Sequence, residues 1–248
     1  MKKISVLFLL SIVLILSINV ISAANDTDID SSTNTTVQKA VKTSVSTPDT
    51  GFIYKKNSFM KITIKDKSTN ESIKNLKIKV KVYTKKKAKT YTLKTDKNGV
   101  AKLPTKKIKL GRHKFIINTT NSSYKVSKKD ILFIGYKKTI NLEINKHKKL
   151  KSKDAITVFL QKKNGQYKKG IYTDVWYAGD DADINPHHTM ILKSKLYFKN
   201  KKTGKIISKT TKGKLFLYNG EIYRTQPEYK LVPGYKPIKA KIWYLTSI

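Results

Sequence analysis

The stretch Lys94-Thr-Asp-Lys-Asn-Gly-Val-Ala-Lys-Leu-Pro104, followed by Leu110-Gly-Arg-His-Lys-Phe-Ile-Ile-Asn118, decides how the first half of the chain folds. Asn98 and Gly99 tolerate positive φ, and Asp96 can bond its own backbone two residues on, so a tight turn is predicted here. Apolar and polar side chains alternate before and after this turn. The stretch therefore predicts two strands joined by a turn, within a larger set of strands.

Period-two alternation continues across residues 51–145. Met60, Ile62 and Ile64 alternate with polar residues, and the apolar positions of residues 76–82 alternate with lysines. Such strands bury one face and leave the other in water. About seven short strands with turn signals between them are typical of an antiparallel sandwich, in which two one-sided sheets cover each other.

The turn at 96–99 and the run 110–117 also carry a resemblance. Residues 52–145 resemble the Ig-like repeat domains of prokaryotic surface proteins, particularly the adhesin-like proteins of methanogenic archaea. The resemblance implies an immunoglobulin-like β-sandwich that serves as a stalk or adhesion module, and it brings no catalytic residues. The chain departs from such proteins in having one clear copy of the repeat and no recognisable anchor.

The N-terminal segment has the composition of a secretory signal peptide. Basic residues at the start, an apolar run over residues 6–20 and small residues at 22–24 predict cleavage after Ala24. An uncleaved anchor helix is the alternative interpretation. Residues 25–50 are rich in Asp, Asn, Ser and Thr, which predicts a flexible polar linker. No later segment is predicted to span a membrane.

Cysteine is absent from all 248 residues. Disulfides, thiolate metal ligands and cysteine nucleophiles are therefore excluded, and stability must come from strand pairing and an apolar core. Five N-glycosylation sequons fit an exported protein. Their acceptor residues are Asn25, Asn34, Asn70, Asn118 and Asn121.

A second domain is predicted after a basic junction at residues 146–153. Residues 154–248 contain both tryptophans and several strand candidates, at 156–160, 170–177, 190–198, 205–209, 214–218 and 238–245. Asn219-Gly220 predicts a hairpin between 215–218 and 222–224. The overall expectation is an all-β chain: an Ig-like sandwich at 51–145 and a second compact antiparallel β-domain that is rich in aromatic residues.

Candidate binding residues in this second domain are the aromatic side chains Trp176, Tyr177 and Trp243, which could stack on sugar faces. The loop that follows Tyr177 gathers acids and histidines. Asp181, Asp183 and Asn185 have the alternate spacing of a calcium loop, although Pro186 stands where that loop needs glycine. His187 and His188 could instead join Asp183 around zinc, although adjacent side chains on an extended strand point to opposite faces. The favoured interpretation is a polar loop without metal or other cofactor, whose acids offset nearby lysines.

The charge balance points to anionic partners. The chain has 53 Lys and Arg against 16 Asp and Glu, a formal net charge of +37. Such a field attracts anionic polymers, and a cell-wall polymer or surface glycan is the expected partner. Export and the lack of a recognition helix or patterned aromatic platform argue against nucleic acid. A lysine surface that only solvates the sheets and blunts their edges is the simpler alternative.

Two functions follow from these patterns. The first is a secreted, non-enzymatic, adhesin-like or envelope-associated binding protein, with the Ig-like module as spacer and the C-terminal domain as recognition head. The second is an extracellular hydrolase or carbohydrate-active enzyme that uses Asp180, Asp181, Asp183 and His187 or His188. The first is favoured, because the chain has no recognised catalytic motif.

Overall fold

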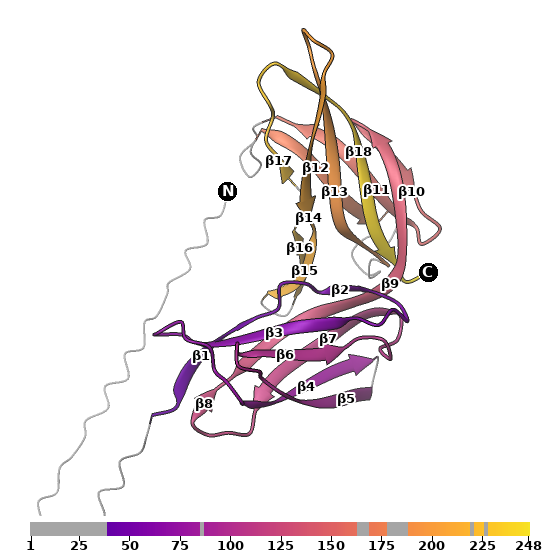
Figure 1. The fold of residues 1–248 in the computed structure, drawn as a ribbon. Coiled ribbons are helices and arrows are strands. Elements are labelled where there is room, and N and C mark those ends of the chain that lie inside the picture. Colours follow the sequence, from indigo (N-terminus) through magenta and orange to yellow (C-terminus); the bar gives the residue numbers. More distant parts are fainter. Residues whose placement is uncertain (1–38, 85–86, 163–168, 178–187, 219–220, 226–227) are drawn as a thin grey trace, which may run out of the picture. The chain divides into compact units, whose positions relative to one another are not determined.

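The computed structural model describes residues 39–84, 87–162, 169–177, 188–218, 221–225 and 228–248 (Figure 1). Strands dominate, and the described residues contain no helix, so the predicted all-β class with antiparallel sheets is confirmed. Accordingly, no helix in these ranges could cross a membrane. The strands are β1 Val41–Ser46, β2 Gly51–Ile53, β3 Phe59–Asp66, β4 Lys77–Thr84, β5 Lys87–Lys94, β6 Val100–Pro104, β7 Gly111–Thr119, β8 Tyr124–Lys125, β9 Ser127–Glu143, β10 Lys146–Lys149, β11 Asp154–Gln161, β12 Gly170–Tyr177, β13 Thr189–Asn200, β14 Ile206–Lys212, β15 Lys214–Tyr218, β16 Glu221–Thr225, β17 Glu228–Tyr229 and β18 Tyr235–Thr246.

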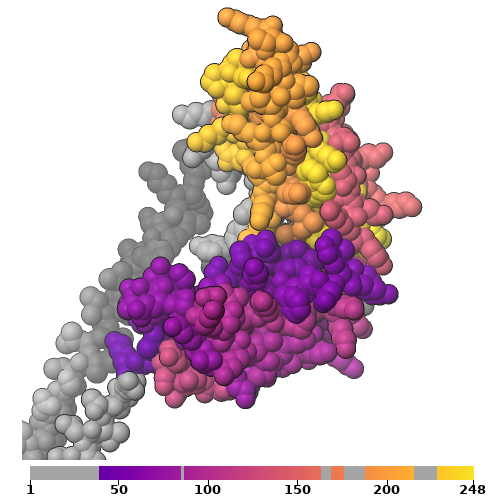
Figure 2. All heavy atoms as spheres, viewed as in Figure 1, coloured from indigo at the N-terminus to yellow at the C-terminus, as the bar shows by residue number. Residues whose placement is uncertain are grey.

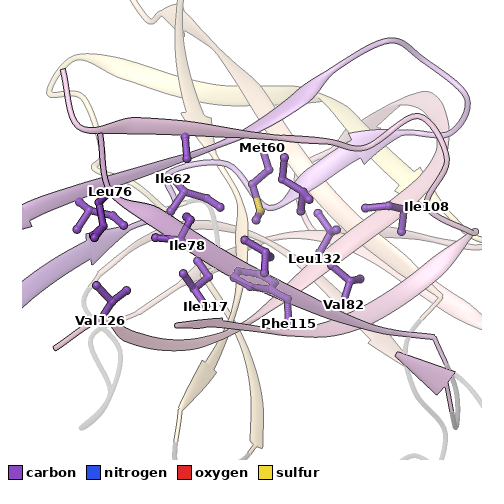
Figure 3. Packing of buried hydrophobic residues seen from close by; sticks show 14 of the residues in the cluster. Met60, Ile62, Leu76, Ile78, Val82, Ile108, Phe115, Ile117, Val126 and Leu132 are labelled. Carbon is purple, nitrogen blue, oxygen red and sulfur yellow. The ribbon is translucent and has the colours of Figure 1, made fainter. Parts of the chain in front are cut away.

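The first half is a sandwich of two sheets. One sheet has the order β6-β3-β1-β8, and the other contains β9-β7-β4-β5. The alternating residues of β3 and β4 meet between them, where Met60, Ile62 and Ile78 are fully buried against Phe115 of β7 (Figure 3). Burial of such side chains stabilises the fold by about 1.5–3 kcal/mol each, and this core holds the sandwich together.

The turn at residues 96–99 forms as its sequence indicates. The Asp96 carboxylate accepts backbone N–H bonds from Asn98 and Val100, both at 2.9 Å. Gly99 has φ of +69°, and its carbonyl oxygen accepts the N–H of Ile64 in β3 at 2.9 Å. A Cβ at Gly99 would lie 2.6 Å from the carbonyl oxygen of Ile64, so this turn is packed directly against β3, the strand that pairs with β6.

Two short strands lie in segments that were expected to be irregular. β1 falls within the predicted linker and pairs with β3, with Val45 packed against the core of the first half. β10 falls within the predicted basic junction and pairs with β11. Neither segment has the apolar alternation of a central strand. Both strands lie at or near a sheet edge, where hydrogen bonds to the partner strand hold the backbone in place.

The second half also has two facing sheets around one core. β10-β11-β12-β17 forms one, and β14-β13-β18-β9 forms the other (Figure 1). Ile156, Leu196, Phe198 and Ile242 are fully buried between them. The predicted hairpin is present, since β15 and β16 pair antiparallel with Tyr218 opposite Glu221.

β9 belongs to both halves. Its first part pairs with β7 and its last part, from Tyr136 on, pairs with β18, so that an eight-stranded sheet contains strands from each half. A small separate core lies along the middle of β9, where Ile131 and Phe133 pack with Met190 and Leu245. The sharing of one strand is not visible in the sequence, because residues 127–143 read equally well as two shorter strands.

Candidate functional site

The acidic and histidine loop lies outside the described residues, and this applies to Asp180, Asp181, Asp183, Asn185 and His187. His188 is described, and its backbone N–H donates to Asp154 at 2.9 Å. Its Nδ1 lies 3.1 Å from the hydroxyl of Ser247. Across the part of the chain that the structure describes, no three Asp, Glu, His or Cys side chains gather as a metal site.

The three predicted aromatic residues lie on two different strands. Trp176 and Tyr177 end β12, where their backbones pair with Ala155 and Asp154 of β11. Their side chains are outside the described part of the structure. Trp243 lies on β18 in the facing sheet and is half-buried.

Two lysines lie close to the indole ring of Trp243. Lys193, its cross-strand partner on β13, places its Nζ 4.6 Å from the centre of the indole ring. Lys241, two residues earlier on β18, places its Nζ at 5.3 Å. Both distances lie within the roughly 6 Å at which an ammonium group is attracted to an aromatic face.

Tyr197 repeats this arrangement on β13. The Nζ of Lys195, two residues earlier on the same strand, lies 5.5 Å from the ring centre. The Nζ of Lys239, the cross-strand partner on β18, lies at 5.7 Å. Two aromatic rings and four ammonium groups therefore form one continuous set, which we call the lysine–aromatic face: Lys193, Lys195, Tyr197, Lys239, Lys241 and Trp243.

A repeated sequence pattern produces this face. Lys193-Ser-Lys-Leu-Tyr197 and Lys239-Ala-Lys-Ile-Trp243 both read Lys-x-Lys-x-aromatic. Antiparallel pairing of the two segments sets the first lysine of each opposite the aromatic residue of the other. The intervening residues, Ser194, Leu196, Ala240 and Ile242, are fully buried, which directs the lysines and rings outward.

Neighbouring strands extend the polar surface. The register sets Lys212 and Thr210 of β14 beside Lys193 and Lys195, and Asn141 of β9 beside Lys241. Glu143 of β9 is opposite Lys239 and is the one acid at these register positions on the described strands. β13, β14 and β18, orange to yellow in Figure 2, lie at the surface of the molecule in this view.

Lysines on this face are also close to one another. Lys195 is directly opposite Lys241 in the β13–β18 register, and Lys193 is directly opposite Lys212 in the β13–β14 register. Like charges in directly opposed positions destabilise a sheet. These two like-charge pairs therefore oppose the pairing of the strands that carry them.

A buried polar cluster fixes the strand ends that flank the acidic loop. Asp154 of β11 is fully buried, and its carboxylate accepts bonds from the Ser152 hydroxyl at 3.3 Å and from the N–H of His188. Burial lowers the pKa of Arg112 on β7, and the negative charge of Asp154 offsets part of this effect. Arg112 belongs to the first half of the chain and Asp154 to the second.

A second buried polar cluster lies in the core of the second half. The Tyr229 hydroxyl lies 2.6 Å from the hydroxyl of Ser194, which in turn lies 3.1 Å from that of Thr173. Burial raises the pKa of Tyr229, and hydrogen bonding to Ser194 offsets part of the rise. These bonds connect β17, β13 and β12, which is a structural role.

Three of the predicted glycan acceptors are described. Asn70, Asn118 and Asn121 are exposed. The Asn70 side chain accepts a bond from Lys65 at 3.3 Å, and that of Asn121 accepts the N–H of Ser123 at 2.9 Å. Asn25 and Asn34 lie outside the described residues. Glycosylation of any of the five stays a prediction.

The sequence indicated Trp243 but not the four lysines around it. The pattern Lys-x-Lys-x-aromatic is present in both segments, but it also occurs at residues 79–83, 87–91 and 212–216, so it does not single these two out. The strand register decides which residues become neighbours, since the pairing of Lys193 with Trp243 is what brings the two segments side by side.

The fold and this face define an all-β, sandwich-like protein with a cationic, aromatic-bearing sheet surface. No family model matches the chain, and no curated protein matches it. Among solved structures, the chain is similar to a proposed membrane-anchored protein from Corynebacterium diphtheriae, at 9% sequence identity and a TM-score of 0.28. The match covers 84% of this chain and 51% of that one, so the chain spans about half of that protein's length. At this TM-score the similarity carries no argument about fold or function.

Proposed function

We propose that the protein is a secreted, non-enzymatic, adhesin-like protein of the cell envelope, in which the lysine–aromatic face of the C-terminal half binds an anionic polymer. The observation that carries the proposal is the set of four ammonium groups held over Trp243 and Tyr197. The Ig-like resemblance of residues 52–145 and the predicted signal peptide support export and a surface role.

The ring contacts favour an anionic ligand over a neutral one. A sugar competes with an ammonium group wherever it stacks on a ring face of Trp243 that a lysine covers, and both Lys193 and Lys241 lie within 5.3 Å of the ring centre. An anion can instead bind these ammonium groups while they stay over the rings. Each exposed cation–π contact contributes about 0.5–1 kcal/mol, enough to restrict a flexible lysine side chain before the ligand arrives.

The type of cation also indicates what is recognised. All the cations of the lysine–aromatic face are lysines, which act as point charges, whereas arginine would provide a planar fork for one carboxylate or phosphate. A row of point charges responds to the density of negative charge along a polymer. We therefore expect tolerance of carboxylate and phosphate polymers and little affinity for short neutral glycans.

The test compares ligands and salt concentrations. The full chain is titrated with polygalacturonate, polyphosphate and a neutral β-glucan, from 0.1 M to 1 M salt. The screening length falls from about 10 Å to about 3 Å over this range, so binding of the two polyanions should weaken steeply and the glucan should not bind. Salt-insensitive binding of the glucan would contradict the proposal.

Two variants separate the contributions of charge and ring. The triple change Lys193→Gln, Lys195→Gln and Lys241→Gln should weaken polyanion binding by roughly 100-fold, if each lysine contributes about 1 kcal/mol at an anionic surface. Trp243→Leu should have a smaller effect, because it loosens the lysines and keeps their charge. A matched control removes three exposed loop lysines elsewhere, Lys74, Lys106 and Lys107. An equal loss of binding in the control would contradict a defined binding face.

A further inference from the structure

A second row of lysines lies on the first half of the chain. Lys77, Lys79 and Lys81 are exposed along β4, and they alternate with the buried core residues of that strand. Lys81 places its Nζ 5.5 Å from the ring centre of Tyr83, so this row ends in the same Lys-x-Lys-x-aromatic pattern. The repetition on another strand is independent of the lysine–aromatic face.

The strands beside β4 leave this row without acidic neighbours. The register sets Lys94 opposite Lys77, and sets Thr92 and Thr90 opposite Lys79 and Lys81 on β5. On β7, Asn118 is opposite Lys79. These paired positions, all within the described strands, carry no Asp or Glu, and Lys77 opposite Lys94 is again a like-charge pair.

The two lysine surfaces are separate. β4 joins the large sheet through β7 to the first part of β9, whereas β18 joins it at the last part of β9. Between these parts, Asp130–Gly135 of β9 is buried, and Ile131 and Phe133 pack in the small core with Met190 and Leu245. A buried apolar segment thus divides the two charged regions.

We propose that the β4 row, Lys77, Lys79 and Lys81, is a second polyanion-binding surface and that the protein bridges two anionic polymer chains. This inference rests on the proposed function of the lysine–aromatic face and extends it from binding to cross-linking. The occupant is a long anionic polymer, since complementary charge is the property that both surfaces share. The first half is then a second binding module as well as a spacer.

The test measures clustering and binding separately. Beads coated with long-chain polyphosphate are mixed with the full chain, and clustering is followed by light scattering while bound protein is measured by depletion from solution. Clustering should rise with protein concentration and then fall, because excess protein saturates each bead singly. One variant carries Lys77→Gln, Lys79→Gln and Lys81→Gln, and a second carries the triple change on the lysine–aromatic face.

Each outcome bears on a different claim. If the protein bridges, the β4 variant keeps binding to beads through the lysine–aromatic face. The variant of the lysine–aromatic face keeps only the weaker binding of the β4 row. Both variants lose clustering, while the control variant at Lys74, Lys106 and Lys107 clusters normally. Clustering by the β4 variant would overturn the inference, because the lysine–aromatic face alone, or self-association, would then explain it. Binding of the unaltered chain without clustering would overturn the inference alone. Absence of binding would overturn the proposed function as well.

Discussion

Replacement of Gly99 by alanine tests whether the turn at residues 96–99 is packed against β3 as described. Two costs are expected. At φ of +69°, an L-residue raises the free energy of the folded state by about 1–2 kcal/mol. About 0.4–1 kcal/mol of this is offset, because alanine reduces the conformational entropy of the unfolded chain. In addition, the new Cβ would lie 2.6 Å from the Ile64 carbonyl oxygen and 3.1 Å from the Ile73 nitrogen, both of them backbone atoms.

Relief of that clash requires β3 to move away from the turn. The hydrogen bond from Ile64 to Gly99 would weaken, at about 1 kcal/mol, and the displacement of a packed strand adds about 1–3 kcal/mol. We expect Gly99→Ala to lower the free energy of unfolding by about 3 kcal/mol in total.

Gly234 provides the matched control. It has a similar φ of +75°, but a Cβ added there would meet no atom within 4 Å, so Gly234→Ala should cost only about 1 kcal/mol. The difference of about 2 kcal/mol corresponds to a melting temperature about 4–8 °C lower for Gly99→Ala than for Gly234→Ala. Thermal and urea unfolding followed by circular dichroism measure both. Equal destabilisation by the two substitutions would refute the packing argument.

Three further predictions concern charge. Hydrogen bonds from the turn amides, chiefly that of Val100, lower the pKa of Asp96 despite some desolvation. The ionised Asp96 carboxylate should therefore stabilise the fold at pH values above the ordinary carboxyl range. This stabilisation should fade as the pH falls through the lowered pKa. Asp96→Asn should reduce this loss of stability in acid unfolding, and an unchanged pH profile would contradict the role. Asp154→Ala should destabilise the fold by about 3–5 kcal/mol. Asp154→Asn should destabilise it by less, because the amide oxygen can still accept a hydrogen bond. Equal free energies of unfolding for the two variants in urea would count against the role of the buried cluster. Lys195→Glu should raise stability by about 0.2–1 kcal/mol by pairing with Lys241, while it weakens polyanion binding, and a parallel loss of both would contradict the repulsion argument.

The central strands could be predicted from sequence because they have local signals. The alternation of Met60, Ile62 and Ile64 locates β3, and residues 170–177 coincide with β12. The edge strands β1 and β10 could not be predicted in this way, since their pairing depends on partners further along the chain rather than on their own apolar pattern.

The candidate site was likewise only partly predictable from the sequence. Trp243 could be singled out from the sequence as an aromatic residue of the aromatic-rich second domain. The ammonium groups around it come from β13 as well as β18, and only the long-range register decides which lysines face the ring. Sequence patterns report the face of a strand on which a side chain lies, but they do not report the neighbour across the sheet.

The sharing of β9 between the two halves imposes an order on folding. The first part of β9 can pair with β7 as soon as both have been synthesised. The part from Tyr136 on must wait for β18, which follows all the other described strands in the sequence. Until then, this part of β9 is an open edge that could pair with another chain. Lys137 and Lys138 lie on this exposed segment, and charged residues on a temporary edge hinder aggregation during the wait.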